Sequence, residues 1–267
     1  MSSIAIRVTF ILLAVACVLA PCTARAQEVD LIPHSTPFDY NFFRQFARNE
    51  LERGPTGLEP LRPWTVPPSF YLKTTVDPTG EVVPPEIIEH VATVLVNGVR
   101  EYSGGRLSAG GVETGTENRP ASTGWANVLL LREISGAMPN IAGQATLGGN
   151  QGTMWLRFDP DDPRLFVNDP SGCYARVVQV AAHEIQHTMG YYHTSGTYAA
   201  RHADPDCDVA NLSESLRYHG GVMYSRPRGN TDPDTDPDGY TLNATAAGSQ
   251  PVVSCSDALV AAGGVIR

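Results

Sequence analysis

The chain reads His183-Glu184-Ile185-Gln186-His187-Thr188-Met189-Gly190-Tyr191-Tyr192-His193 at its most informative point. An α-helix turns about 100° per residue, so His183 and His187 lie one turn apart on the same helical face. A continuous helix would carry His193 roughly 9 Å farther along its axis and away from that face. Gly190 can end the helix, because glycine adopts a positive φ without a Cβ clash. His193 can then fold back toward the other two histidines.

This pattern predicts a catalytic zinc site. Three neutral imidazoles, from His183, His187 and His193, leave one position of a tetrahedral Zn²⁺ ion open, whereas structural sites usually fill all four positions with protein ligands. The open position takes a water, whose pKa the metal lowers toward about 7. Glu184 would take the proton of this water during attack on a carbonyl and then deliver it to the leaving amine. The alternative, a buried amphipathic helix with incidental histidines, explains neither His193 nor a carboxylate inside an apolar run.

The motif resembles the signature of the metzincin zinc peptidases, which also requires a methionine turn downstream. Met223 follows His193 in the sequence Gly220-Gly221-Val222-Met223-Tyr224-Ser225-Arg226-Pro227, where turn-forming residues flank it on both sides. The resemblance implies that Met223 forms a hydrophobic floor beneath the metal. It also implies an α+β zincin domain: a twisted, mostly parallel sheet with an antiparallel edge strand, an active-site helix, the methionine turn and a C-terminal helix.

Within the metzincins, the chain is most similar to the matrixins. Met223-Tyr224 matches the Met-Tyr of their turn. Three further segments resemble matrixin sequence: Trp64–Val76, Gly143–Ala145 and Phe158–Asp162. The chain departs from the pattern at Gln186, where matrixins usually have glycine, and at Ser225, where astacin-like relatives have a tyrosine ligand. No histidine lies in Thr153–Phe158, which argues against the second, structural zinc of matrixins.

The first residues have the features of a signal peptide. Arg7 provides a positive start, Val8–Ala20 an apolar core, and Ala24-Arg25-Ala26 a cleavage site, so we expect residues 1–26 to be removed. The protein would then be secreted or periplasmic. Acylation at Cys17 or Cys22 is the alternative, which the proline before Cys22 disfavours.

Removal of this segment takes away two arginines and no acid, so the formal charge moves from −9 to −11. An acidic surface argues against nucleic acid and anionic membranes as partners, and we expect a monomer. The mature chain suits one catalytic domain, residues 61–267. Residues 27–60 form either a short pro-segment or an N-terminal extension that packs on the domain. Within them, Phe38–Arg53 predicts a short helix that ends at Gly54-Pro55.

Periodicity predicts the remaining elements. The expected strands are 69–76, 128–133, 144–147 and 153–158, and the expected helices are 84–102, 176–189 and 257–262. The strand at 153–158 is either an inner strand or an edge strand along which a peptide substrate binds in extended form. His90, His202 and His219 have no ligand spacing, and we expect them on the surface.

Two acidic segments and the cysteines provide further candidates. Asp234, Asp236 and Asp238 form the DxDxDG opening of a calcium loop, although Thr245 stands where the bidentate glutamate belongs, so a solvated loop is the alternative. The run at 159–162 is a second calcium candidate. Of the three cysteines in the mature chain, we expect Cys207 and Cys255 to form a disulfide worth about 3–4 kcal/mol, with Cys173 free.

The sequence thus predicts a secreted zinc endopeptidase that holds Zn²⁺, with Ca²⁺ as a second candidate ion, and acts on peptide or protein substrates. Two alternatives stay open. One is a secreted binding protein that keeps the zinc fold without turnover. The other is a peptidase that cuts a single partner, as a toxin or a processing factor does.

Overall fold

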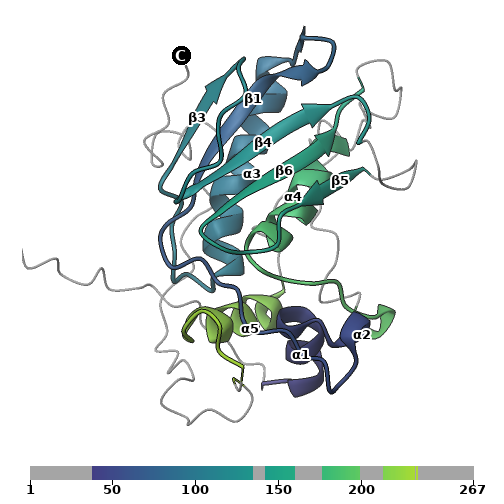
Figure 1. Ribbon diagram of the computed structural model, residues 1–267, viewed down its shortest axis with the longest axis vertical. Helices are drawn as coiled ribbons and strands as arrows, with labels where there is room; N and C mark the ends of the chain where they lie inside the picture. The colour runs from purple at the N-terminus through teal and green to yellow at the C-terminus, as the bar shows by residue number, and fades with distance from the viewer. Residues whose placement is uncertain (1–37, 135–141, 160–175, 199–212, 232, 234–267) are drawn as a thin grey trace, which may run out of the picture.

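The computed structural model describes residues 38–134, 142–159, 176–198, 213–231 and 233. Within them the fold is α+β, with one open mixed sheet, two helices on a face of that sheet and further helices below its end (Figure 1). The signal peptide expected at 1–26 and the closing helix expected at 257–262 lie outside the described residues, and both stay predictions.

The sheet combines parallel and antiparallel pairs. Its strands are β1 (Ser69–Asp77), β2 (Glu81–Val82), β3 (Gly111–Gly115), β4 (Trp125–Leu131), β5 (Gly143–Ala145) and β6 (Gln151–Arg157). Their order is β2-β1-β4-β6-β5, and β3 also pairs with β1. The pairs β1–β3, β1–β4 and β4–β6 are parallel, whereas β2 and β5 run antiparallel to their neighbours. A mostly parallel sheet with an antiparallel edge strand is therefore confirmed.

The position of β6 settles the question about residues 153–158. β6 pairs with β4 on one side and with β5 on the other, so of the two alternatives the inner strand is confirmed and the edge strand is wrong. Met154 and Leu156 are fully buried, but alternating burial does not reveal whether a strand has a second neighbour. Among the described strands, the short β5 forms the edge on this side of the sheet.

The helices are α1 (Tyr40–Arg48), α2 (Glu50–Arg53), α3 (Pro85–Tyr102), α4 (Arg176–Thr188) and α5 (Glu214–Tyr224), with a 3₁₀ turn at Gly196–Tyr198. α3 and α4 lie side by side behind the sheet in Figure 1. They approach closely at Gly98, where an added Cβ would lie 2.7 Å from Cγ1 of Ile185. The predicted boundaries of α3 and the predicted C-terminal end of α4 are confirmed to within a residue.

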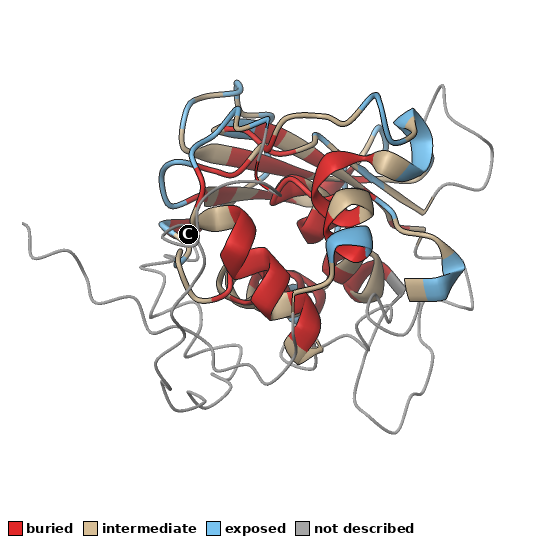
Figure 2. Cartoon of the chain, turned by 90° about the horizontal axis from the view of Figure 1, so that it is seen from below, coloured by how far each residue is buried: buried red, intermediate tan, exposed pale blue. Residues whose placement is uncertain are grey.

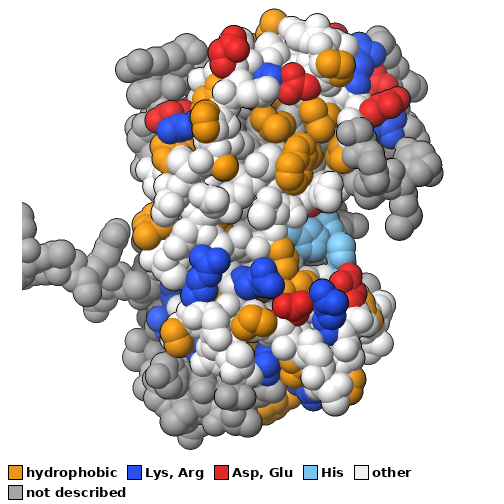
Figure 3. Space-filling model, viewed as in Figure 1, with side chains coloured by type: hydrophobic (Ala, Val, Ile, Leu, Met, Phe, Trp, Pro, Cys, Tyr) orange, Lys and Arg blue, Asp and Glu red, His pale blue; other side chains and the backbone are white. Residues whose placement is uncertain are grey.

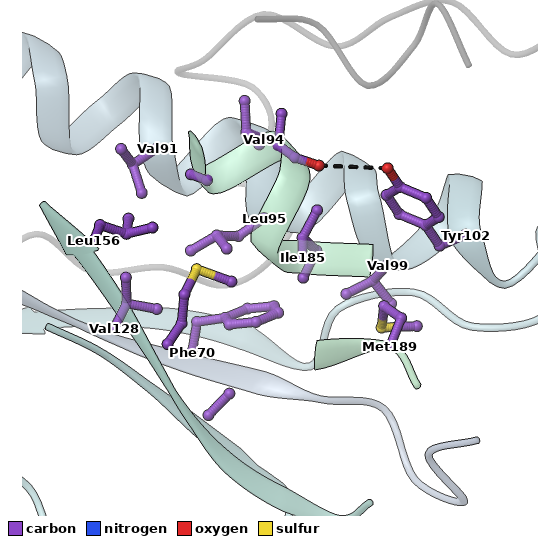
Figure 4. Packing of buried hydrophobic residues seen from close by; sticks show 14 of the residues in the cluster. Phe70, Val91, Val94, Leu95, Val99, Tyr102, Val128, Leu156, Ile185 and Met189 are labelled. Carbon is purple, nitrogen blue, oxygen red and sulfur yellow. Dashed lines mark hydrogen bonds between the residues drawn. The ribbon is translucent and has the colours of Figure 1, made fainter. Parts of the chain in front are cut away.

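The core lies between these two helices and the sheet, as Figure 4 shows. Phe70 of β1, Leu95 of α3 and Ile185 of α4 are each fully buried there. The hydroxyl of Tyr102 donates a hydrogen bond of 3.3 Å to the carbonyl oxygen of Ala182 in α4. The core therefore fixes α4, the helix of the zinc motif, against the sheet.

The predicted helix at Phe38–Arg53 is two helices. Asn49 takes a left-handed conformation, with φ 57°, which ends α1 and begins α2. Asp39 caps α1, since its carboxylate accepts hydrogen bonds from the backbone N–H groups of Asn41 and Phe42. α1 lies beside α5 below the sheet, although the two are far apart in sequence (Figure 1). Figure 2 looks from this side and shows buried residues running through these helices.

Met223 does not lie in a tight turn, so the predicted methionine turn is wrong in its local structure. It belongs to the last helical turn of α5, and Ser225 follows as the C-cap. The glycines before it allow close approach instead of a turn. An added Cβ at Gly220 would lie 2.3 Å from the carbonyl oxygen of Tyr102, and one at Gly104 would lie 2.5 Å from Cα of Gly221.

His219 is fully buried, so its expected surface position is also wrong. Its Nε2 accepts the backbone N–H of Asp39 at 2.8 Å, and its Nδ1 lies 2.6 Å from the carbonyl oxygen of Ser215. Both ring nitrogens are satisfied, which lets an imidazole replace an apolar side chain in the core. Among the described helices, none has the length and apolar character needed to span a membrane.

Candidate metal centre

The zinc motif folds as its spacing predicts. His183 and His187 lie one turn apart on α4, which ends at Thr188. Gly190 has φ 99°, and its N–H bonds to the carbonyl oxygen of His187 while Tyr191 N–H bonds to that of Gln186. These bonds close the helix, and the chain then turns back so that His193 reaches the other two imidazoles.

Other segments donate hydrogen bonds to the last carbonyl oxygens of α4 as well. Trp64 Nε1 donates a 2.7 Å hydrogen bond to the carbonyl oxygen of Thr188, and Gly148 N–H donates one of 3.0 Å to that of His187. The carbonyl groups at a helix end have no partner within the helix, so these donors stabilise its last turn. The two ligands on α4 are thus held on a rigid element.

The three histidines converge on one point. The Nε2 atoms lie 3.3 Å apart between His183 and His187, 3.1 Å between His187 and His193, and 3.1 Å between His183 and His193. Three nitrogens around a tetrahedral ion at about 2.0–2.1 Å would lie roughly 3.3–3.4 Å apart. The triangle is close to this size, and the three residues form a group able to hold a metal ion such as zinc.

Neighbouring groups orient two of these rings. His187 Nδ1 lies 2.7 Å from the carbonyl oxygen of Tyr191. A carbonyl oxygen only accepts, so Nδ1 carries the proton and Nε2 keeps its lone pair for a metal. The amide nitrogen of Gln186 lies 3.3 Å from Nδ1 and 3.4 Å from Nε2 of His183. Gln186, the residue that departs from matrixin sequence, therefore packs against the ring of the first ligand.

Glu184 is the most unusual group in the site. Its side chain is 5 % exposed, and among the described residues its Oε2 has no hydrogen-bond partner. Burial raises the pKa of this carboxyl from 4.5 to about 7, because the charged form loses its hydration. A group that can both take and release a proton near neutrality has the property a general base and acid requires.

A cavity of about 700 Å³ opens in front of these residues. One wall comes from β5 and the segment that follows, with Gly143, Gln144, Ala145 and Leu147, and another from α4. Tyr192 and Glu52 complete the lining on the side of the lower helices. Figure 3 shows the histidines in a hollow between the upper part of the molecule and this lower part.

Sequence reasoning missed three contributors to this cavity. Gly143 packs so closely on the site that an added Cβ would lie 2.6 Å from Oε1 of Glu184. Glu52 comes from α2, in the segment for which a pro-segment was an open interpretation. Tyr192 lies within the motif between Gly190 and His193, at a position where the motif specifies no residue type.

Met223 is fully buried, and its methyl carbon would lie 2.9 Å from a Cβ added to Gly190. Met223 therefore packs against the bend that returns His193 to the other ligands. The hydrophobic floor that the metzincin resemblance implies stays a prediction.

The other predicted sites fall largely outside the described residues. This holds for the calcium candidates Asp234, Asp236 and Asp238 and for Cys173, Cys207 and Cys255, so the calcium loop and the disulfide stay predictions. Of the second acidic run only Asp159 is described, and its carboxylate lies 3.5 Å from Nη1 of Arg132.

Comparisons of the chain with models of known protein families, with curated proteins and with solved structures found no match. The case for a function therefore rests on the geometry of the site.

Proposed function

We propose that this protein is a zinc-dependent endopeptidase that acts outside the cytoplasm. The observation that carries the proposal is the buried, unpartnered carboxylate of Glu184 beside three imidazoles whose Nε2 atoms converge. His183, His187 and His193 would hold the ion. When bound, zinc supplies Lewis acidity that polarises a carbonyl and makes a water more acidic.

The chain's own residues supply the proton transfers. Glu184 accepts a proton from the attacking water, because its pKa of about 7 leaves a substantial fraction ionised at neutral pH. The protonated carboxyl then gives the proton to the leaving amine. The burial that raises this pKa makes the carboxylate a stronger base than an exposed glutamate, and a pKa near 7 still lets the carboxyl release the proton at neutral pH.

The edge that β5 leaves free among the described strands favours an extended peptide as the substrate. Across the β5–β6 pair, Thr146 N–H donates to the carbonyl oxygen of Thr153, and Arg157 N–H donates to that of Ala142. Backbone groups of successive residues alternate in direction along a strand, so Gly143 and Ala145 direct theirs away from β6. Both residues line the cavity. An extended peptide could add to this edge through main-chain hydrogen bonds, which favours peptide bonds over small esters.

The proposal is tested with Glu184→Gln, using Glu86→Gln on the exposed first turn of α3 as the matched control. Peptide hydrolysis should fall by about 10²–10⁴-fold in Glu184→Gln, while its zinc content and zinc affinity stay close to wild type. The control should keep full activity. Hydrolysis in the wild type should stop on chelation and return with added Zn²⁺. Undiminished cleavage by Glu184→Gln would sink the mechanism.

A random peptide library separates the remaining alternatives. Broad cleavage that a chelator stops indicates a general endopeptidase. Stoichiometric zinc binding without cleavage of any peptide would favour a binding protein or a peptidase dedicated to one partner.

A further inference from the structure

We infer that residues 38–53 are a permanent part of the active site, in which α1 positions the third metal ligand, His193, by fixing the backbone on both sides of it. The inference rests on the metal site of the proposed function but does not require peptide hydrolysis. It decides against removal of this segment on activation.

His193 lies in a segment that cannot hold itself in place. Residues 191–195 have no regular secondary structure, and the His193 side chain is exposed. α4 has already ended at Thr188, and the next element is the 3₁₀ turn at Gly196–Tyr198. The position of the imidazole therefore depends on what binds the backbone around it.

Two hydrogen bonds in which α1 supplies the acceptor bracket the ligand. Tyr192 N–H donates to the carbonyl oxygen of Phe46 at 2.8 Å, and Ser195 N–H donates to Oε1 of Gln45 at 2.9 Å. Consecutive residues of one helix thus hold the residue before His193 and the second residue after it. Among the described residues, no other backbone bond from Tyr192, Thr194 or Ser195 N–H is formed.

Aromatic packing holds α1 against the same segment. The ring of Phe46 stacks on that of Tyr191 with centroids 4.0 Å apart and an angle of 6° between planes. Phe42 contacts the ring of Tyr198 at 5.4 Å, so the two ends of the His193 segment are both covered. α1 is part of the hydrophobic core, because its residues Phe42, Phe43 and Phe46 are all fully buried.

The same segment forms part of the cavity wall. Glu52 of α2 lines the cavity, and Asn49 Nδ2 donates a 3.2 Å hydrogen bond to its Oε2. Among the described residues, Glu52 makes no hydrogen bond or ion pair with the three histidines, so the segment contributes to the lining without occupying the positions of the ring nitrogens. A pro-segment that inhibits by masking would instead place a group on the ligands.

Gln45 is therefore a positioning residue, and three variants test it. Gln45→Met keeps the length of the side chain but removes the acceptor, Gln45→Glu restores an acceptor oxygen, and Asn41→Ala on the exposed side of α1 is the control. Zinc affinity is measured by competition with a chromophoric chelator, a readout that does not need turnover. We expect Gln45→Met to bind zinc about 3- to 10-fold more weakly, Gln45→Glu to recover most of this loss, and Asn41→Ala to match wild type. Equal zinc affinity in all three variants would overturn the positioning role of Gln45.

A cut in the chain tests the whole segment. A recognition site for a specific protease is inserted between Pro55 and Thr56, in the exposed loop after α2, and as a control between Thr79 and Gly80 in the exposed β1–β2 turn. After cleavage of the folded full chain, the N-terminal fragment should co-elute with the rest and zinc affinity should stay unchanged.

The opposite pattern would overturn the inference. If the fragment leaves the native protein after cleavage while zinc affinity is retained and peptide hydrolysis rises, residues 38–53 are a pro-segment. If the protein binds zinc as expected but hydrolyses no peptide in any form, the proposed function fails while the positioning of His193 is still tested by affinity.

Discussion

Substitution of Glu184 by glutamine should stabilise the metal-free protein at alkaline pH. Glu184 is buried, its Oε2 has no partner among the described residues, and its pKa lies near 7 in the folded state. In the unfolded chain the same group has its ordinary value near 4.5. The folded state therefore holds this proton more tightly than the unfolded state does.

The sign and size of the effect follow from this difference. Between about pH 4.5 and pH 7 the folded state binds more protons, so the free energy of unfolding falls as the pH rises. The loss of unfolding free energy caused by the ionised carboxylate is complete above about pH 7 and absent below about pH 4.5. At 1.36 kcal/mol per pKa unit, it amounts to about 3 kcal/mol. Glutamine cannot ionise and should not show this loss.

Urea unfolding at pH 4.5 and pH 8, with a chelator present throughout, measures the effect. The stability difference between Glu184→Gln and wild type should grow by about 3 kcal/mol in favour of the variant from pH 4.5 to pH 8. Other titrating groups cancel in this comparison, and Glu86→Gln should show a difference within about 0.5 kcal/mol at both pH values. A variant that is equally or less stable at pH 8 would refute the reasoning that burial without a partner sets the pKa of Glu184.

Two glycines give the remaining predictions. Gly143→Ala places a methyl group 2.6 Å from Oε1 of Glu184 and should lower the steady-state rate of peptide hydrolysis by at least 10-fold. The control Gly196→Ala, with no atom within 4 Å of the new Cβ, should leave this rate unchanged; equal rates in the two variants would show that β5 does not set the position of the carboxylate. Gly190→Ala imposes φ 99° on an alanine and brings its Cβ to 2.9 Å from the methyl carbon of Met223. The free energy of unfolding in urea should therefore fall by about 1–3 kcal/mol, and zinc should bind more weakly. A wild-type unfolding free energy together with wild-type zinc affinity would mean that an alanine fits the bend before the third ligand without strain.

The convergence of the three histidines could be predicted from sequence because their geometry is local. Helical spacing alone brings His183 and His187 together, and Gly190 supplies the break that returns His193, as the structure confirms. The strands β1, β4 and β6 and the helices α3 and α4 were also predictable, since each carries an apolar pattern with the period of its own secondary structure, whereas β2 and β3 were not expected. None of these inferences requires knowledge of a distant part of the chain.

Apart from the break that the left-handed Asn49 makes between α1 and α2, the errors involve partners distant in sequence. Gly220 indicated a turn, but it serves the close approach of α5 to the end of α3. His219 lacked ligand spacing and looked exposed, because its partner Asp39 comes from the other end of the chain. The role of β5 could not be predicted either, since a strand of three residues shows almost no periodicity. The same limit concealed the bonds from α1 to the His193 segment.

The environment of Glu184 also bears on the choice between a peptidase and a zinc-binding module. Three imidazoles suffice to hold an ion, and a module that only binds it gains nothing from a buried carboxylate without a partner. That carboxylate costs about 3 kcal/mol above pH 7, a large share of the roughly 5–15 kcal/mol by which domains are stable. A cation next to the site offsets this cost by favouring the ionised form. The same burial gives Glu184 the proton affinity that acid–base chemistry near neutral pH requires, so the cost of this carboxylate to the fold favours the proposed peptidase over a module that only binds metal.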